Sequence, residues 1–320
     1  MIKVSAPGKL MLFGEHSVVY QRPCIVTAVN YRMSTILEKR NDDKVVLNAP
    51  EVNLLNYTAS LASLDKLHPK EAQFAIRALF NFFEKYKIRS GINIQTKSDF
   101  NSKVGLGSSS AVTVNIIKGL SELLGIKMNQ EELFELSYKT VLDIQGVGSG
   151  FDVAAAIYGK TLFFNLKERI FRLIETEKLP IIIGYTGIKA DTTTLVKMVK
   201  EKLDKESGKI NRIFDEITEI VNLAKIEIEN SDWEKVGELM NLNQELLRKI
   251  DVSSKELESL ISASLSAGAY GAKLSGAGGG DCMIAIAPSD NYHNIKDAIQ
   301  RVGGQIIEAD IQAQGVKVEA

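Results

Sequence analysis

The 320-residue sequence lacks the features that mark several specialised classes of protein. It has only 2 cysteines, Cys24 and Cys282, which provide neither a disulfide framework nor the paired spacing of a zinc site. Its 39 lysine and arginine residues are balanced by 40 aspartate and glutamate residues, so the net charge is −1. Proteins that bind nucleic acid or membrane surfaces usually carry a basic excess, and no apolar run reaches the roughly 20 residues that span a bilayer. We therefore expect neither a nucleic-acid partner nor a membrane partner.

The first residues, MIKVSAPGKL, also lack the basic segment and the long apolar segment of a signal peptide. Disulfides are rare in reducing compartments, which agrees with two cysteines far apart in the chain. We expect an ordinary globular protein of the cytoplasm, long enough to bury a sizeable core.

Strand and helix patterns are mixed along the whole sequence. β-branched or continuously apolar segments predict strands, and apolar residues recurring every three or four positions predict helices. The expected strands are 2–5, 24–38, 44–49, 91–98 and LPIIIGYTG, and the expected helices are 69–87, 129–144 and about 193–206, 208–229, 232–249 and 254–267. Regular βαβ alternation is absent, which predicts an α+β fold. A domain boundary before LPIIIGYTG would divide the chain into 1–178 and 179–320.

The stretch GLGSSSAVTVNIIKGL places Gly105 and Gly107 before three serines at the start of a predicted helix. Glycine lets a backbone approach a ligand closely and adopt a positive φ. The first N–H groups of a helix lack intrahelical partners and lie at the positive end of the helix dipole. Together these features indicate an anion site, most often for phosphate. A serine N-cap after a glycine turn would give the same local pattern, and the Gly-Lys-Ser/Thr ending of a Walker loop is absent.

Three other segments carry small residues next to a charged side chain or a further glycine. SAPGKLMLFGEH places Lys9 after a proline and a glycine, GVGSGFD ends at Asp152, and GAKLSGAGGGDC is another glycine loop. Each segment alone is explained by a turn. Their joint presence between apolar segments favours a ligand site over turns alone.

These segments resemble the signature motifs of the GHMP kinases, the superfamily of galactokinase, homoserine kinase, mevalonate kinase and phosphomevalonate kinase. APGKLMLFGEH, VGLGSSSA and KLSGAGGGDC occur in the family's order, and the match spans Ala6 to Asp281. The resemblance implies an N-terminal ribosomal-S5-like domain, a C-terminal ferredoxin-like domain and an active site between them. It also implies ATP and Mg²⁺ as cofactors and a small-molecule substrate, and it leaves a homodimer open because many relatives are dimers.

The resemblance implies roles for two charged residues in phosphoryl transfer, which needs charge neutralisation, in-line placement and a path for the hydroxyl proton. Asp152 maps onto the catalytic aspartate that accepts the proton. Lys9 maps onto the lysine that keeps this aspartate ionised and stabilises the developing alkoxide. For Asp152 alone, a helix N-cap is the alternative.

The resemblance also implies that two glycine loops hold the nucleotide, with Ser109 as a Mg²⁺ ligand and Ser108 beside it on phosphate. The implied ATP-binding residues are Gly105, Leu106, Gly107, Ser108, Ser109, Ser110, Gly276 and Gly278. One departure concerns Val141, which stands where many relatives carry a glutamate as a second Mg²⁺ ligand. Asp143 lies two residues on, about 200° round a helix, and is no obvious substitute.

The segment FGEHSVVYQRP is most similar to mevalonate kinases, which makes Glu15 and His16 candidates for the substrate site. Thr192 maps onto a threonine near the substrate, with an ordinary helix N-cap as the alternative. The apolar pair Val18 and Val19 suits a small branched acid better than a polyol. The implied activity is ATP-dependent phosphorylation of the 5-hydroxyl of mevalonate to 5-phosphomevalonate, in isoprenoid biosynthesis.

Two alternatives stay open at this point. GSGFDVAAAIYG and GAGGGDC are similar to phosphomevalonate kinases, and Lys103, Lys189 and Lys273 would supply positive charge for a phosphorylated substrate. The chain could also be a non-catalytic relative that binds nucleotide, although such a protein has no need of a base beside a lysine.

Overall fold

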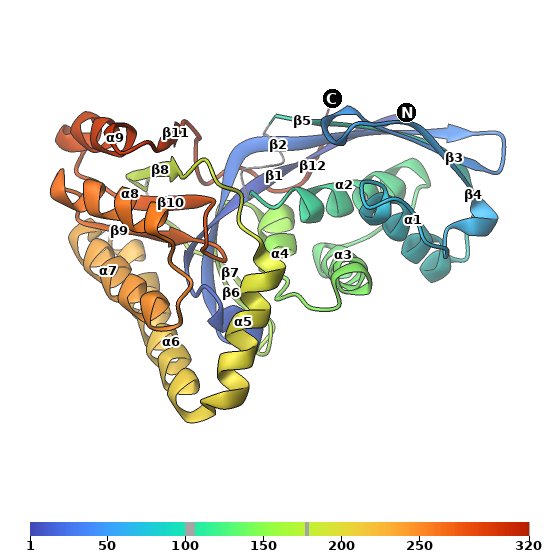
Figure 1. Ribbon diagram of the computed structural model, residues 1–320. Helices are drawn as coiled ribbons and strands as arrows, with labels where there is room; N and C mark the ends of the chain where they lie inside the picture. The colour runs from blue at the N-terminus through green and yellow to red at the C-terminus, as the bar shows by residue number, and fades with distance from the viewer. Residues whose placement is uncertain (100–105, 177–178, 320) are drawn as a thin grey trace.

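The computed structural model describes residues 1–99, 106–176 and 179–319, which form two sheets covered by helices (Figure 1). The larger sheet has eight strands in the order β12-β1-β2-β5-β3-β4, and β6 pairs with β2 and carries β7. All of its pairings are antiparallel except that of β3 with β5. The strands are β1 (Ile2–Phe13), β2 (Cys24–Arg40), β3 (Lys44–Ala49), β4 (Leu54–Ser60), β5 (Gly91–Ser98), β6 (Thr161–Asn165), β7 (Ile170–Leu173) and β12 (Lys317–Val318).

Four helices lie on one side of the larger sheet in Figure 1. They are α1 (Gln73–Tyr86), α2 (Ser108–Leu123), α3 (Gln130–Gln145) and α4 (Phe151–Tyr158). α2 packs along β1 and β2 and contacts the other three helices, so its N-terminus is held against the sheet. Asn129 caps α3: its side chain accepts from the Glu132 N–H while the Glu132 carboxylate accepts from the Asn129 N–H.

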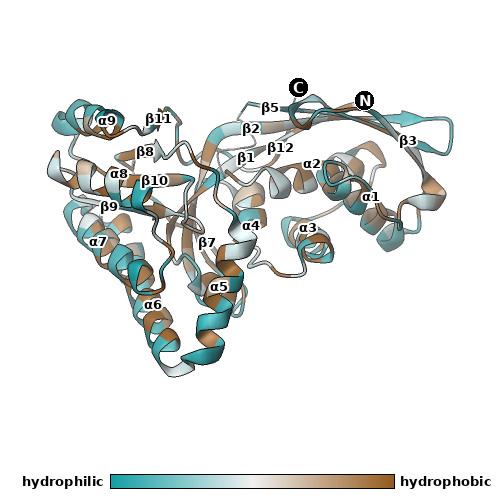
Figure 2. Cartoon of the chain, viewed as in Figure 1, coloured by the Kyte–Doolittle hydropathy of each residue, from teal (hydrophilic) through white to brown (hydrophobic). Residues whose placement is uncertain are grey.

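The smaller sheet is antiparallel, with the order β11-β8-β10-β9. Its strands are β8 (Ile181–Tyr185), β9 (Gly271–Ser275), β10 (Cys282–Ile286) and β11 (Gln305–Ile307). The helices of this half are α5 (Thr192–Lys205), α6 (Ser207–Glu229), α7 (Trp233–Lys249), α8 (Lys255–Ser266) and α9 (Tyr292–Arg301). α5 and α6 form a hairpin whose turn carries mostly hydrophilic residues (Figure 2), as expected for a solvent-exposed end.

The α+β fold class and the predicted strands at 44–49 and 91–98 are confirmed. β4 was not predicted, because its residues 54–60 have no clear apolar alternation. The end of the chain also differs from a simple two-part division, because the chain leaves the smaller sheet after β11 and its last strand, β12, pairs with β1 of the larger sheet. The limits 1–178 and 179–320 stay a prediction.

Candidate active site

Lys9 and Asp152 come together although 142 residues separate them in the sequence. Lys9 lies on β1 and Asp152 lies in the first turn of α4, and Lys9 Nζ is 3.6 Å from Asp152 Oδ1. The Lys9 Nζ also lies 5.3 Å from the centre of the Phe151 ring. Among the described residues, no donor hydrogen-bonds to Asp152 Oδ1 although this atom is buried. A buried carboxylate oxygen that has no hydrogen-bond donor can accept a hydrogen bond from a substrate hydroxyl.

The start of α2 lies directly against Lys9. The Lys9 N–H donates to the Leu106 carbonyl at 3.0 Å. Gly107 has φ 86°, and a Cβ at this position would lie 3.2 Å from Lys9 Cγ. The lysine stem therefore passes where any other residue would place its side chain, which requires glycine at this position.

The first turn of α2 contains Ser108 and Ser109, which are half-buried, and Ser110, which is buried. Its N-cap is Gly107, which has no side chain to bind the first N–H groups. These N–H groups are therefore available to an anion. Gly105 and Lys103 lie outside the described residues, so their predicted roles stay predictions.

The N-cap alternatives for three predicted site residues are wrong. α2 is capped by Gly107 and not by a serine, and α4 is capped by Gly150 and not by Asp152. α5 is capped by Asp191, whose side chain accepts from the Thr194 N–H at 3.1 Å. Thr192 is therefore the first residue of α5, exposed and not needed as a cap.

The third glycine loop needs glycine for two different reasons. A Cβ at Gly278 would lie 2.0 Å from the Val252 carbonyl oxygen, and the next residue, Gly279, donates its N–H to that same oxygen at 2.8 Å. Gly276 has φ 102°, and among the described residues, its two chain neighbours aside, no atom lies within 4 Å of the position that a Cβ would take. The loop is thus packed at Gly278 and open at Gly276, where a ligand can approach the backbone.

Glu15 and Lys273 form an ion pair with both side chains completely buried. The Lys273 ammonium also donates to its neighbouring Leu274 carbonyl at 2.6 Å. Burial raises the pKa of the Glu15 carboxyl and lowers the pKa of the Lys273 ammonium, while each charge opposes the shift in the other. Lys273 is therefore not a surface cation for a phosphorylated substrate. A direct contact of Glu15 with substrate stays a prediction.

His16 follows Glu15 in a left-handed conformation with φ 59° and is buried. Its Nε2 lies 2.9 Å from the Ala277 carbonyl oxygen. A carbonyl only accepts, so Nε2 carries the hydrogen. Burial lowers the pKa of the imidazole, which favours the neutral form. The last residue of the first motif is thus docked on the third glycine loop.

Asp281 ends this glycine loop, and the sequence alone did not indicate a role for it. Burial raises the pKa of its carboxyl, and the nearby positive charges of Lys9 and Lys189 oppose this shift. The residue therefore lies in the electrostatic environment of the candidate site. Its only sequence signal was an acidic residue directly after the glycines.

The donor set fits a Mg²⁺ ion held mainly by nucleotide phosphates. Val141 is buried and offers no ligand, and Asp143 is engaged by Lys139 and Asn81. No group of three His, Cys, Asp or Glu residues suited to a metal occurs in the part of the chain that the structure describes. The Ser109 hydroxyl in the first turn of α2 would be the protein ligand, since Mg²⁺ needs only one or two protein ligands when phosphates supply others.

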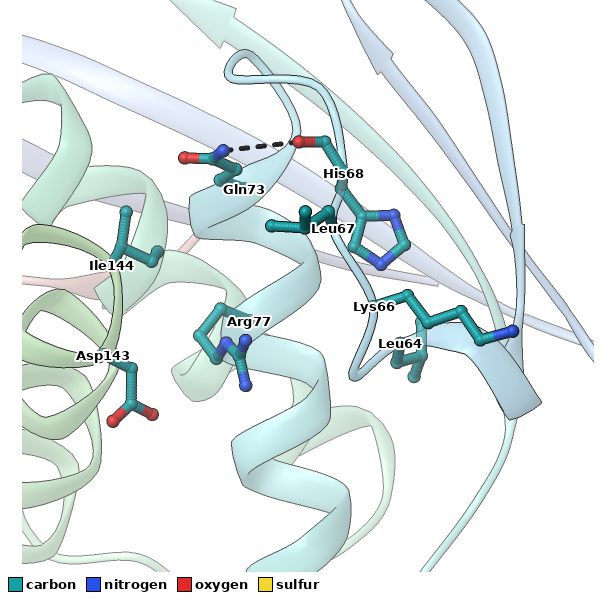
Figure 3. Close-up of a pocket in the computed structure, with 8 residues that line it drawn as sticks. All are labelled: Leu64, Lys66, Leu67, His68, Gln73, Arg77, Asp143 and Ile144. Atoms are coloured by element: carbon teal, nitrogen blue, oxygen red, sulfur yellow. Dashed lines mark hydrogen bonds between the residues drawn. The ribbon is translucent and has the colours of Figure 1, made fainter.

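A pocket of about 140 Å³ lies where the segment before α1 meets the end of α3 (Figure 3). Its lining combines apolar and polar side chains. The lining residues are Leu64, Lys66, Leu67, His68, Gln73, Arg77, Asp143 and Ile144. The end of α3 continues through a glycine segment to Asp152, so the pocket and the ion pair are joined by a short stretch of chain.

A helix start prepared for phosphate beside a lysine–carboxylate pair is the arrangement of an enzyme that transfers phosphoryl groups to a hydroxyl. The sequence model of the GHMP kinases N terminal domain matches residues 73–160, and that of the GHMP kinases C terminal domain matches residues 205–305. The chain belongs to the GHMP kinases and is an ATP-dependent kinase.

The chain is similar to mevalonate kinases along its whole length. It is 35% identical to the mevalonate kinase of Pyrococcus furiosus, over 98% of this chain and 97% of that protein. The structure of Methanococcus jannaschii mevalonate kinase matches with a TM-score of 0.82 and 26% identity, over 97% and 98% of the two chains. L. major mevalonate kinase in complex with R-mevalonate matches with a TM-score of 0.76 and 26% identity, over 98% and 96%.

The structure of Streptococcus pneumoniae phosphomevalonate kinase matches with a TM-score of 0.80 but only 20% identity, over 97% of this chain and 100% of that chain. This likeness shows the shared fold alone. Within the described residues, no helix is both long and apolar enough to cross a bilayer.

Proposed function

We propose that this kinase transfers the γ-phosphoryl group of ATP to the 5-hydroxyl of mevalonate. The observation that carries the proposal is the Lys9–Asp152 pair at the start of α2, with a buried Asp152 oxygen that has no hydrogen bond within the described chain. The full-length similarity to the Pyrococcus furiosus mevalonate kinase supports the choice of acceptor.

In the proposed reaction, Asp152 accepts the proton of the attacking hydroxyl at Oδ1. Lys9, 3.6 Å away, stabilises the negative charge that develops on the acceptor oxygen. The N–H groups of the first turn of α2 bind the phosphates, with Ser108 and Ser109 beside them. Mg²⁺ at Ser109 would supply further charge neutralisation on the phosphates.

The adenine is proposed to bind in the pocket before α1. The pocket has apolar side chains for a purine and polar groups at its edge. Ile144→Trp should fill it and raise the KM for ATP about tenfold or more, since 1.4 kcal/mol of lost binding is a factor of ten. Val302→Trp is the matched control, because Val302 lines a separate pocket near α8 and α9. An unchanged KM for ATP in Ile144→Trp would contradict this placement.

The acceptor is tested by coupled ADP release with Mg²⁺-ATP and one acceptor at a time: mevalonate, 5-phosphomevalonate, galactose or homoserine. Turnover with mevalonate alone is the expected result. Turnover with 5-phosphomevalonate alone would contradict the proposal and favour the phosphomevalonate kinase alternative. If none of the four acceptors is phosphorylated, the result would contradict the proposal and favour the non-catalytic alternative.

A role in isoprenoid biosynthesis, a cytoplasmic location, a homodimer and the domain limits 1–178 and 179–320 remain proposals of the same kind. Direct contacts of Glu15, His16 and Thr192 with the acceptor are also proposed. The docking of His16 on Ala277 supports a site between the first and third motifs.

A further inference from the structure

Asp281 joins the third glycine loop to the segment 186–191, which leads into α5. Its N–H donates to the Ile188 carbonyl at 2.7 Å, and its carbonyl accepts from the Thr186 N–H at 3.0 Å. The Thr186 hydroxyl donates to the same carbonyl at 3.1 Å. These backbone bonds continue the pairing of β8 with β10 and do not depend on the Asp281 side chain.

The Asp281 side chain adds a contact of a different kind. Its Oδ1 accepts a hydrogen bond from the Ala190 N–H at 3.1 Å. Ala190 directly precedes Asp191, the N-cap of α5, and Thr192 follows. The carboxylate thus binds the backbone just before the helix that presents Thr192.

The neighbouring glycines bring the two segments into close contact. A Cβ at Gly280 would lie 2.6 Å from the Ile188 carbonyl oxygen, and a Cβ at Gly279 would lie 2.8 Å from the Leu195 side chain. Asp281 itself has φ 54°, a conformation that aspartate tolerates better than most residues but glycine adopts most easily. A residue with a carboxylate therefore stands where the backbone favours glycine.

The carboxylate also lies near the proposed catalytic lysine. Lys9 and Lys189 both oppose the rise in the pKa of Asp281 that burial causes. Asp281 therefore connects the glycine loop to the segment before α5, and its carboxyl is influenced by the charge of Lys9.

We propose that Asp281 is a positioning residue whose carboxylate, through the Ala190 N–H, fixes the segment 186–191 and the start of α5 against the glycine loop beside Lys9. The inference rests on the proposed function, because the acceptor is expected between Lys9 and Thr192. A loosened segment would have to be ordered when the acceptor binds, and this ordering cost weakens binding of the acceptor more than it slows the chemical step.

The test compares Asp281→Gly with Asp281→Asn. Glycine removes the carboxylate and fits the left-handed backbone, so folding is not at risk. Asparagine keeps an oxygen for the Ala190 N–H and tolerates the same φ. Asp251→Gly is the matched control, because Asp251 has φ 59° and binds Lys202 in the later part of α5.

Two measurements are made on each full-length protein. Hydrogen–deuterium exchange of 186–195 without ligand should become about tenfold faster in Asp281→Gly and stay near the unmutated protein in Asp281→Asn and Asp251→Gly. Steady-state kinetics with mevalonate should show a KM raised about tenfold in Asp281→Gly, kcat within about threefold, and recovery in Asp281→Asn.

Unchanged exchange of 186–195 in Asp281→Gly would overturn the inference. So would an Asp281→Asn protein as impaired in KM as Asp281→Gly, because the hydrogen bond would then not be the cause. The exchange measurement needs no substrate. If the unmutated protein fails to phosphorylate mevalonate, the proposed function fails while the exchange result still decides whether Asp281 fixes the segment.

Discussion

Glu15 and Lys273 form a fully buried ion pair that joins the two sheets of the molecule. Glu15 follows β1 of the larger sheet, and Lys273 lies on β9 of the smaller one. On the same strands, the Met11 N–H donates to the Ser275 hydroxyl at 3.1 Å, and this hydroxyl donates to the Met11 carbonyl at 2.8 Å. The two halves are therefore fixed to each other through contacts between β9 and the end of β1.

Breaking this ion pair should be strongly destabilising. Lys273→Met leaves the Glu15 carboxylate buried without its partner, and we expect the free energy of unfolding to fall by about 3–5 kcal/mol. Glu15→Gln should have a similar effect, and the double variant should recover part of the loss. Urea unfolding at neutral pH measures all three proteins.

The control for this prediction is Lys200→Met, which breaks the exposed pair with Asp204 on α5. Exposed ion pairs contribute about 0–1 kcal/mol to the free energy of unfolding. If Lys273→Met is no more destabilising than Lys200→Met, the buried pair does not hold the two sheets together.

The buried His16 should make stability depend on pH. Burial lowers the pKa of its imidazole from 6.5, so the unfolded chain binds a proton that the folded protein does not. The resulting stabilisation is complete above pH 6.5 and is lost as the pH falls towards the lowered pKa, by at most about 1.4 kcal/mol per pH unit. His16→Asn removes this dependence.

Urea unfolding at pH 7.5 and pH 5.5 checks this prediction, because other titrating groups are shared by both proteins and cancel in the comparison. The stability advantage of the unmutated protein over His16→Asn should shrink at the lower pH. An advantage that stays constant between the two pH values would show that His16 is not held neutral.

Gly107 should be required for catalysis because of its contact with Lys9. Gly107→Ala places a methyl group 3.2 Å from Lys9 Cγ at a backbone φ of 86°. Gly125→Ala has a similar strain, with φ 69°, but its methyl group meets no atom within 4 Å in the described part of the chain apart from its two neighbours in sequence. Both should lose about 1–2 kcal/mol of stability. Only Gly107→Ala should lower kcat/KM for ATP, by about tenfold or more, and equal kinetics in the two variants would contradict this role of Gly107.

Lys9 and Asp152 were expected to lie together because each stands in a motif with its own glycine signature that resembles a GHMP kinase motif, and the structure brings them together, while their catalytic roles stay a proposal. The α2 start was predictable for the same reason, since glycine before a helix has a clear physical meaning. The Glu15–Lys273 pair was not predictable, because an isolated lysine carries no sign of which distant carboxylate it will meet. The sequence indicated a surface cation at Lys273, whereas the fold buries it.

Other elements depend on long-range pairing in the same way. β12 has two residues and forms only because β1 offers a free edge. The role proposed for Asp281 depends on the Ala190 N–H, which belongs to a segment 91 residues earlier. Local periodicity contains no information on such partners.

In the proposed mechanism, Asp152 removes the hydroxyl proton while other groups hold the nucleotide. Asp152→Asn keeps the size of the side chain and removes the base. We expect kcat for ADP release with mevalonate to fall by about 10²–10⁴, with ATP affinity by calorimetry unchanged within about threefold. Asp204→Asn, on the exposed face of α5, serves as the control. A kcat for Asp152→Asn close to that of the unmutated protein would contradict the account.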